Sequence, residues 1–593
     1  MKTTFTRLGA GALLLSLTMS LAYGAESGDL ATRRKALDSL IQEQWDYTMR
    51  SSPEWASIIG DKRYNDRWTD FSPAAIEADV RANAAFLRRF EAIDTSGFPE
   101  QEQLNHDLML RSLRLNAEGA RFKDWEMPVA QNSGVHIDTP QIVAMLSFDS
   151  VKDYEDYLAR LHKLPRLFEQ TTQQMRKGMQ DQLMPPQFLI PKIAKQCQEL
   201  AAMAPAASPF AQPVQKFPAS IPAAEQARLR RAVLAAIRQD VLPAYKKFAR
   251  FVSTEYQPHG RREVGMWSLP DGAARYSYKA KAATTTEQTP EQIHQLGLAE
   301  VQRIEAQMLG VAQKLGFADL KSFNAALASN PALHPTSRQH IIDLYNKYTE
   351  QMYARLPEQF GILPKGKVEI AQVEAFREQG ASAASYNQGT ADGKRPGRVM
   401  VNTGDFAQRS LIDIETTALH EGVPGHHLQI AIGQEIAGLP LFRQQGNYTA
   451  YAEGWALYSE RLGEELGFFT DPYSYYGHLQ DEMLRAIRLV VDTGLHYKQW
   501  SRQQVVDFFH DHSGIEEVEV QSETDRYIVW PGQALGYKIG QLKILELRDY
   551  ARTQLGSKFD IRQFHDQVLG AGALPMDVLE RRIKAWVAAR QAS

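Results

Sequence analysis

The chain has 593 residues, of which 44% are hydrophobic and 23% are charged, and its formal net charge is −3. This apolar fraction supports a folded core and excludes a disordered or low-complexity protein. The single cysteine, Cys197, excludes a disulfide scaffold and any metal site built from several thiolates. The small net charge provides no basic surface for nucleic acid, so we expect no nucleic-acid partner.

The first 24 residues have the features of a secretory signal peptide. Lys2 and Arg7 precede an apolar run from Leu8 to Ala22, and Ala22-Tyr23-Gly24 fits the small-residue cleavage pattern. The run is shorter than the ~20 residues that a membrane span needs, which favours cleavage over an uncleaved anchor. We therefore expect an exported protein, periplasmic or secreted, with no membrane attachment once the signal is removed.

Apolar residues recur at helical spacing along most of the chain. This pattern predicts helices over 32–50, 73–93, 153–179, 223–254, 290–315, 337–356, 413–419, 448–466, 475–500, 501–510, 536–555, 561–569 and 575–590. Two segments rich in β-branched residues, 367–373 and 398–402, are the best strand candidates. Residues 203–222 contain five prolines and indicate a surface crossing or hinge. The expected fold is mostly α with one small sheet.

The residues expected to carry chemistry begin at His420-Glu421. In the zinc-hydrolase pattern H-E-x-x-H, two histidines four residues apart share one helix face, and the glutamate polarises the attacking water. Here Pro424 occupies the position of the second histidine, and the next histidines are His426 and His427. Neither of them reaches His420 in an unbroken helix, because a six-residue step changes the face and a seven-residue step separates the pair by about 10 Å.

Pro424-Gly425 supplies a break in that helix, since proline lacks the amide hydrogen and glycine tolerates unusual angles. We expect a local bulge that brings His426 to the metal, with His427 as the reserve ligand. Glu453, 27 residues after His426, is the candidate third ligand, because its small neighbours allow close approach of another helix and a carboxylate facing that approach needs a cation. Two histidines and one glutamate leave a fourth position open for water. The alternative is a solvated cluster of histidines at a helix end.

The motif from His420 to Gln429, followed by Glu453-Gly-Trp-Ala-Leu-Tyr, resembles the bacterial family called domain of unknown function 885. Further matching stretches are Ser52-Pro53-Glu54 to Gly60 and 153–186, 267–272, 289–298, 392–403 and 531–540. The resemblance implies a relation to gluzincin-type metallopeptidases, with a helical body similar to thimet-type oligopeptidases, peptidyl-dipeptidases and carboxypeptidase Taq. Gly425-His426 resembles the Gly-His of their shorter motif, which favours His426 over His427.

The same resemblance implies a role for Tyr537, whose position is similar to that of the late tyrosine that stabilises the oxyanion in related peptidases. A core tyrosine is the alternative. Arg526 could hold a substrate carboxylate through its planar guanidinium, or form a surface salt bridge. His496 stands four residues after Asp492, and we expect it to line a cleft or support the site.

The segment 398–402 alternates as a strand does. An edge strand there could pair with an extended peptide through the backbone of Val399, Met400 and Val401. The alternative is an ordinary strand inside the sheet.

Together these features predict an exported zinc metallopeptidase that hydrolyses oligopeptides. Zn²⁺ is expected on His420, His426 and Glu453, with Glu421 as the proton acceptor and Tyr537 at the oxyanion. We expect one large helical body of two lobes, 25–222 and 223–593, around a deep cleft, with the small sheet near the metal site. The alternatives are a helical peptide-binding protein with a structural or degenerate metal site, and a metal-dependent hydrolase of a non-peptide amide or ester.

Overall fold

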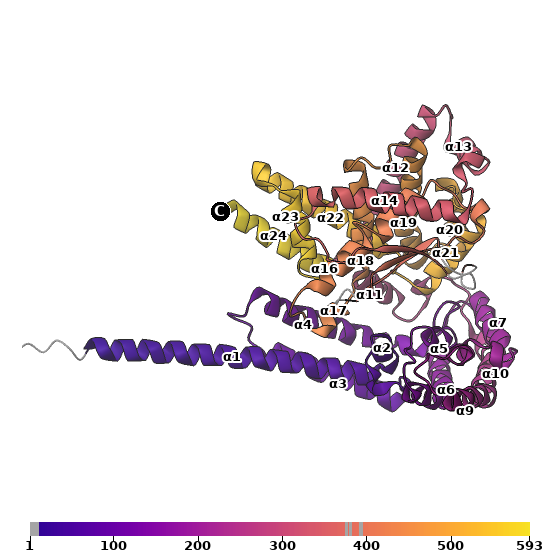
Figure 1. Ribbon diagram of the computed structural model, residues 1–593, viewed down its shortest axis with the longest axis horizontal. Helices are drawn as coiled ribbons and strands as arrows, with labels where there is room; N and C mark the ends of the chain where they lie inside the picture. Colours follow the sequence, from indigo (N-terminus) through magenta and orange to yellow (C-terminus); the bar gives the residue numbers. More distant parts are fainter. Residues whose placement is uncertain (1–10, 374–377, 379–381, 391–394, 593) are drawn as a thin grey trace, which may run out of the picture. The chain divides into compact units, whose positions relative to one another are not determined.

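The computed structural model describes residues 11–373, 378, 382–390 and 395–592, with side chains from Asp29 onward. It is mostly helical, which confirms the expected fold class (Figure 1). Residues 1–10 of the expected signal peptide lie outside the described residues, and 11–24 form the first turns of helix α1. Among the described helices, none combines the length and apolar character needed to cross a membrane.

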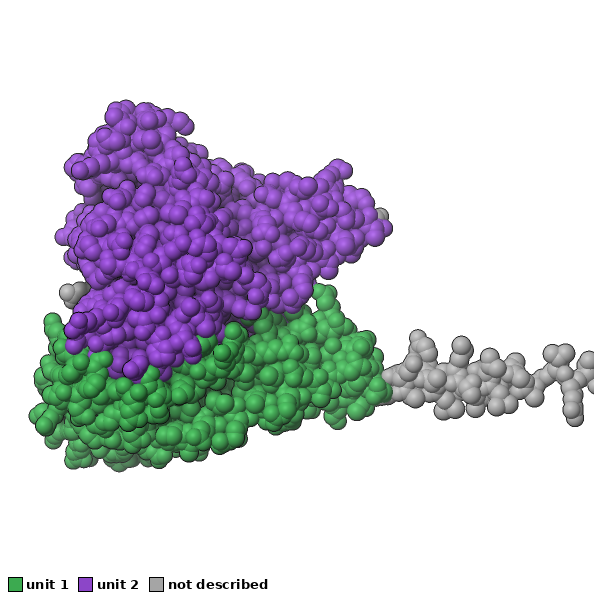
Figure 2. All heavy atoms as spheres, turned by 180° about the vertical axis from the view of Figure 1, so that it is seen from behind, with its two compact units in different colours: residues 1–181, 190–259 green, residues 182–189, 260–593 purple. Residues whose placement is uncertain are grey.

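The chain divides into two compact units, which Figure 2 colours separately. The first contains residues 1–181 and 190–259. Its helices are α1 (Gly11–Ser51), α2 (Pro53–Ile58), α3 (Pro73–Glu91), α4 (Glu100–Ala120), α5 (Val135–Val143), α6 (Val151–Gln180), α7 (Ile190–Ala201), α8 (Gln212–Gln215), α9 (Ala223–Ala236) and α10 (Leu242–Phe251).

This division differs from the expected boundary at 222/223. Helices α9 and α10 pack on α6 and α7, so residues 223–259 lie with the N-terminal elements. The proline-rich segment 203–222 also belongs to this unit, because Phe210 is fully buried and Arg230 of α9 donates a hydrogen bond to the Val214 carbonyl. Proline interrupts regular helix there without marking the limit of a unit.

The second unit contains residues 182–189 and 260–593. Its helices are α11 (Gly272–Thr284), α12 (Pro290–Lys314), α13 (Leu320–Ala328), α14 (Arg338–Gln359), α15 (Ile414–Glu421), α16 (His426–Glu435), α17 (Leu441–Gln444), α18 (Thr449–Glu465), α19 (Pro472–His496), α20 (Arg502–His512), α21 (Glu517–Val529), α22 (Leu535–Leu555), α23 (Ile561–Leu569) and α24 (Met576–Ala592). Several of these helices were not among the predicted elements, including α4, α5, α7, α11, α13, α16 and α21.

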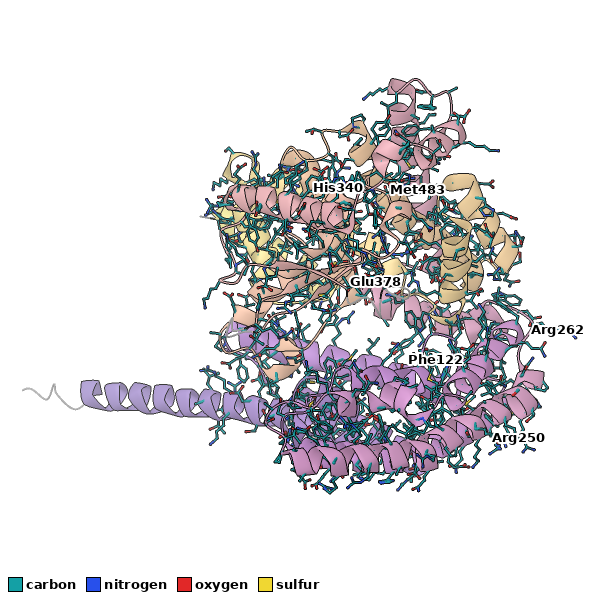
Figure 3. All side chains as sticks on the ribbon, turned by 45° about the vertical axis from the view of Figure 1, so that its right-hand side comes forward. Phe122, Arg250, Arg262, His340, Glu378 and Met483 are labelled. Atoms are coloured by element: carbon teal, nitrogen blue, oxygen red, sulfur yellow. The ribbon has the colours of Figure 1, made fainter. Side chains whose placement is uncertain are left out.

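Helix α19 forms the centre of this unit and packs along α12, α15, α20 and α22. Met483, labelled in Figure 3, is one of its many almost fully buried side chains. The helix is buried on nearly every face although it also carries polar side chains, among them Arg488, Asp492 and His496, which have partners inside the protein.

A three-stranded sheet precedes α15, with strand order β1 (Glu369–Gln372), β3 (Arg398–Val401), β2 (Ala384–Asn387). Strand β3 pairs in parallel with β1 and antiparallel with β2. The two predicted strand segments correspond to β1 and β3. Val399 and Val401 of β3 pack in one cluster with α14 and α15, so the sheet supports the helix that carries His420.

Candidate metal centre

The helix that carries His420-Glu421 breaks where the sequence predicted. Helix α15 ends at Glu421 and α16 begins at His426. The peptide between Val423 and Pro424 is cis, and the Gly425 amide donates a hydrogen bond to the Leu419 carbonyl at 3.0 Å. A Cβ at Gly425 would lie only 1.9 Å from the His420 carbonyl oxygen, so only glycine allows the chain to fold back this closely.

Because of this fold-back, His420 and His426 lie together although six residues separate them. Their ring centroids are 4.8 Å apart and their planes nearly perpendicular, at 88°. Glu453 reaches both from α18, with its Oε2 atom 3.6 Å from His420 Nε2 and 3.5 Å from His426 Nε2. Trp455 of the same helix donates a hydrogen bond to the Pro424 carbonyl at 2.8 Å, which fixes the broken segment against α18.

These separations suit a tetrahedral zinc site. With metal–ligand distances of 2.0–2.2 Å, neighbouring ligands of a tetrahedral ion are about 3.4 Å apart, close to the observed 3.5–3.6 Å. Donor atoms of His420, Glu421 and His426 also lie within 4.8 Å of one another, so Glu421 is a rival third ligand. Glu453 fits better because one of its oxygens is near the tetrahedral spacing from both histidine nitrogens.

Glu460 completes the surroundings of His420 and was not predicted. Its Oε1 atom lies 2.6 Å from His420 Nδ1, and its side chain is 1% exposed. A carboxylate on the second ring nitrogen fixes the tautomer in which Nε2 faces the metal. Glu460 follows Glu453 by seven residues, or two helical turns, so both lie on one helix face. This spacing was the feature of the sequence that could have identified Glu460. The other Glu460 oxygen lies 3.7 Å from Nδ1 of buried His478.

The carboxylates make the site strongly favour a positive charge. Burial lowers the pKa of His420, but Glu453 and Glu460 outweigh burial and raise it to about 10. Burial raises the pKa of Glu453, but His420 and His426 outweigh it and hold the value well below the usual range. Either a proton or a metal ion can supply the charge that these groups require.

His427, the reserve ligand, faces elsewhere. Its Nδ1 atom lies 3.0 Å from the Tyr386 hydroxyl, and its Nε2 atom lies 3.1 Å from the Gly366 carbonyl oxygen. The ring is 2% exposed, and burial lowers its pKa. With both nitrogens occupied, His427 ties α16 to the segments around β1 and β2, and His426 remains the second histidine of the cluster.

Tyr537 reaches the same region through a close helix crossing. A Cβ on Gly454 of α18 would lie 2.5 Å from the backbone of Gly540 on α22, so two glycines allow the helices to touch. The small neighbours of Glu453 therefore serve the close approach that the sequence predicted. Burial raises the pKa of the Tyr537 hydroxyl, and the Glu453 charge raises it further. Tyr537 therefore lies close enough to Glu453 for the carboxylate charge to affect its hydroxyl.

Arg488 of α19 supports Tyr537 and was not assigned a role from the sequence. Its guanidinium carbon lies 4.8 Å from the centre of the Tyr537 ring. Arg488 also donates to the Tyr527 hydroxyl at 3.0 Å and to Glu523 at 3.1 Å. These partners hold the guanidinium against the ring face, a favourable cation–π arrangement.

Arg526 is paired within the protein. Two of its nitrogens donate to the two carboxylate oxygens of Glu523 at 2.8 and 2.9 Å, and a third donates to Gln533 at 2.7 Å. Its side chain is 20% exposed. Arg526 therefore forms a salt bridge, which was the alternative to substrate binding, although the bridge is partly buried. Few of its guanidinium N–H groups remain for a substrate carboxylate.

Of the two alternatives for residues 398–402, the described sheet contains the strand inside the sheet and not the edge strand. Strand β3 is the central strand, and its backbone groups pair with β1 on one side and β2 on the other. Val399, Met400 and Val401 are buried, with exposed fractions of 0%, 9% and 1%. Val399 and Val401 form a core with α14 and α15, and the buried, paired strand is not available to a peptide.

His496 does not face a substrate either. It is 1% exposed, its Nδ1 accepts the Met266 amide at 3.0 Å, and its Nε2 donates to the Tyr527 carbonyl at 2.9 Å. Burial lowers its pKa to about 3. Asp492 accepts hydrogen bonds from the Tyr276 hydroxyl and the Gly532 amide, so the pair fastens α19 to α11, to α21 and to the segments around Met266 and Gly532.

Comparison with known proteins confirms one part of the resemblance noted from the motifs, the family called domain of unknown function 885. A family described as bacterial protein of unknown function (DUF885) matches residues 53–583. The solved structure of a "putative lipoprotein" from Colwellia psychrerythraea is 30% identical, covers 94% of this chain and 100% of its own, and superposes with a TM-score of 0.88. A "putative lipoprotein of unknown function" from Shewanella oneidensis, 17% identical, shares the fold over 92% of this chain and 99% of its own, with a TM-score of 0.74. No curated protein matches. This chain belongs to the DUF885 family.

Proposed function

We propose that the protein is a zinc-dependent metallopeptidase of the gluzincin type. The observation that carries this proposal is the placement of Glu453 Oε2 at 3.5–3.6 Å from Nε2 of both His420 and His426. A glutamate oxygen at tetrahedral spacing from two histidine nitrogens, with a second carboxylate behind one of the histidines, is typical of a catalytic zinc site with a free fourth position.

A zinc ion in this site would supply a Lewis acid that polarises a carbonyl and lowers the pKa of water. Glu421, the last residue of α15, is partly exposed, and no described residue donates a hydrogen bond to its carboxylate. It is therefore free to accept a proton from the attacking water and to deliver that proton to the leaving amine. Tyr537 donates its hydroxyl hydrogen to the developing oxyanion, held in place by Arg488.

A peptide substrate is supported by the edge of the sheet. Strand β2 lies at an edge of the described sheet, and Tyr386 on this strand lies within 3.0 Å of His427, the residue after His426. An extended peptide added alongside β2 would use backbone hydrogen bonds for affinity. The backbone role first assigned to β3 thus passes to β2. The deep cleft expected from the resemblance stays a prediction.

We also propose that the protein is exported. The N-terminal pattern is that of a signal peptide, and the two similar solved structures carry the description of lipoproteins. Export to the periplasm or beyond is the form of the proposal.

The test combines metal analysis with peptide digestion. Purified protein is expected to contain about one zinc per chain and to cleave a mixed peptide library, read by mass spectrometry, only without chelator. Glu421→Gln should retain zinc but lose cleavage, since glutamine cannot accept the proton. Full activity of Glu421→Gln would refute the assignment of the base. Zinc without cleavage of any peptide would favour a structural site or a hydrolase of a non-peptide amide or ester.

A further inference from the structure

A separate cavity of about 720 Å³ lies entirely within the first unit. It is lined by the end of α1, by α3, by α6 and by the loop 67–71. Four aromatic side chains contribute to it, namely Tyr47, Trp68, Phe71 and Trp125. The last of these follows α4 and buried Phe122, which is labelled in Figure 3. This volume falls in the range of about 300–1,000 Å³ found for small-molecule sites.

The loop that forms one wall is held by residues of the Ser52-Pro53-Glu54 motif, for which the proposed peptidase has no use. The Glu54 carboxylate accepts the Thr69 amide at 2.9 Å and the Thr69 hydroxyl at 2.6 Å. On the other side Arg160, which is fully buried, donates to the Arg67 carbonyl at 2.8 Å. Trp68 returns a hydrogen bond from its indole to the Arg160 carbonyl at 2.7 Å.

Two glutamines of α6 fix the rest of the loop. Gln170 accepts the Phe71 amide at 3.3 Å, and Gln174 donates to the Phe71 carbonyl at 2.8 Å. Both glutamines are buried. An irregular loop held by this many side-chain bonds is a preformed wall, which lowers the entropy lost when a ligand binds.

The charges at the cavity favour an anion. Its lining includes four cationic side chains, of Arg50, Arg67, Lys163 and Arg166, but only two carboxylates, of Asp70 and Asp79. Both carboxylates already have donors: Asp79 accepts the Tyr47 hydroxyl at 3.0 Å, and Asp70 accepts Gln170 at 2.7 Å and Arg166 at 3.2 Å.

Arg50 is the cation available to a ligand. Lys163 pairs with Asp66 at 2.9 Å and Arg67 lies 3.3 Å from the same residue. Among the described residues no carboxylate pairs with Arg50, and its guanidinium lies 5.3 Å from the centre of the Tyr47 ring. Arg50 lies in the last turn of α1, where the helix carbonyls attract a cation, and this alone is a reason for a basic residue. The same position also places the guanidinium beside the aromatic wall of the cavity.

We propose that this cavity binds a small aromatic carboxylate, with the ring among Tyr47, Trp68 and Trp125 and the carboxylate on Arg50. Aromatic walls favour a flat apolar ring, and a planar guanidinium matches a carboxylate. The proposal does not depend on the metal site or on peptidase activity. A free aromatic acid and the C-terminal residue of a peptide share this chemistry.

The test is calorimetric titration of the full chain with three probes. N-acetyl-L-phenylalanine carries the ring, the acetamido group and the carboxylate. Its amide keeps the ring and the acetamido group but has no charge, and 3-phenylpropionate keeps the ring and the carboxylate but lacks the acetamido group. The acid should bind about tenfold more tightly than the amide, the value of one charge-assisted contact. Equal affinities for the acid and 3-phenylpropionate would indicate a free aromatic acid, whereas preference for the acetylated form would indicate a peptide C-terminus.

Variants tie the binding to the cavity. Arg50→Gln should remove the difference between acid and amide, while Arg238→Gln, an exposed arginine of the same unit that does not line the cavity, should keep it. Trp125→Leu should weaken both ligands alike and keep the preference for the acid. Equal affinity of acid and amide, the same effect from both arginine variants, or no saturable binding at millimolar concentration would overturn the proposal.

Discussion

Gly425 provides the sharpest test of how the chain brings its two histidines together. In Gly425→Ala the new Cβ would lie 1.9 Å from the His420 carbonyl oxygen and 2.4 Å from that of Leu419. Ordinary contact between such atoms begins at 3.4 Å, so the segment before α16 must retreat by about 1.5 Å. Ligand distances in a metal site tolerate about 0.2 Å. His426 should therefore leave the site, and we expect zinc affinity to fall by at least about 100-fold, with a loss of about 1–3 kcal/mol in stability.

The matched control is Gly433→Ala, which makes the same substitution in the last turn of α16. Nothing lies within 4 Å of its added Cβ, so this variant should keep zinc and gain about 0.5–1 kcal/mol from helix propensity. Zinc affinity is measured by competition with a chromogenic chelator, and stability by thermal unfolding of the apo-proteins. If Gly425→Ala binds zinc as tightly as Gly433→Ala, the close return of the chain at Gly425 does not position His426.

Three further substitutions test other parts of the structure. Glu460→Gln should lower zinc affinity by about 10- to 100-fold, because a neutral amide no longer supports His420. Tyr537→Phe should keep zinc but lower kcat by about 10²- to 10³-fold, the usual cost of one lost oxyanion donor. His496→Gln tests pH dependence. With a folded pKa of about 3, His496 stays neutral in the native protein but takes up a proton on unfolding below about pH 6.5. As the pH falls from 6.5 to 5, the free energy of unfolding of the unmutated protein should therefore decrease by about 2 kcal/mol, whereas that of His496→Gln should not show this decrease. The difference in stability between the two proteins should narrow by that amount.

Each of these results has a clear contrary outcome. An unchanged zinc dissociation constant in Glu460→Gln would mean that the carboxylate does not hold His420. Full turnover in Tyr537→Phe would remove Tyr537 from the oxyanion. A stability difference that stays constant between pH 7 and 5 in urea titrations would show that His496 titrates alike in both states. Nearby Asp492 is present in both proteins, so its own titration largely cancels in this comparison.

The break at Pro424-Gly425 is a feature that neighbouring residues alone could predict. Proline excludes a regular helix, and the histidine spacing requires a fold-back, so both the break and the choice of Glu453 followed from neighbouring residues. Glu460 could have been noticed in the same way, because it lies on the same helix face as Glu453. Its role could not be predicted, because the sequence alone does not show that a histidine packs against this second carboxylate.

Helical periodicity and the pattern of His, Glu, Pro and Gly residues by themselves determined a mostly α protein with a candidate metal site on α15, α16 and α18. These features depend on residues close in the chain, whose spacing sets which side chains share a face. Only the tertiary structure shows that His426 lies beside His420 and Glu453 while His427 faces elsewhere, since Tyr386 and Gly366, which occupy His427, come from distant segments. It also placed β3 between two partners and enclosed His496, because strand order and burial depend on packing between segments far apart in the sequence.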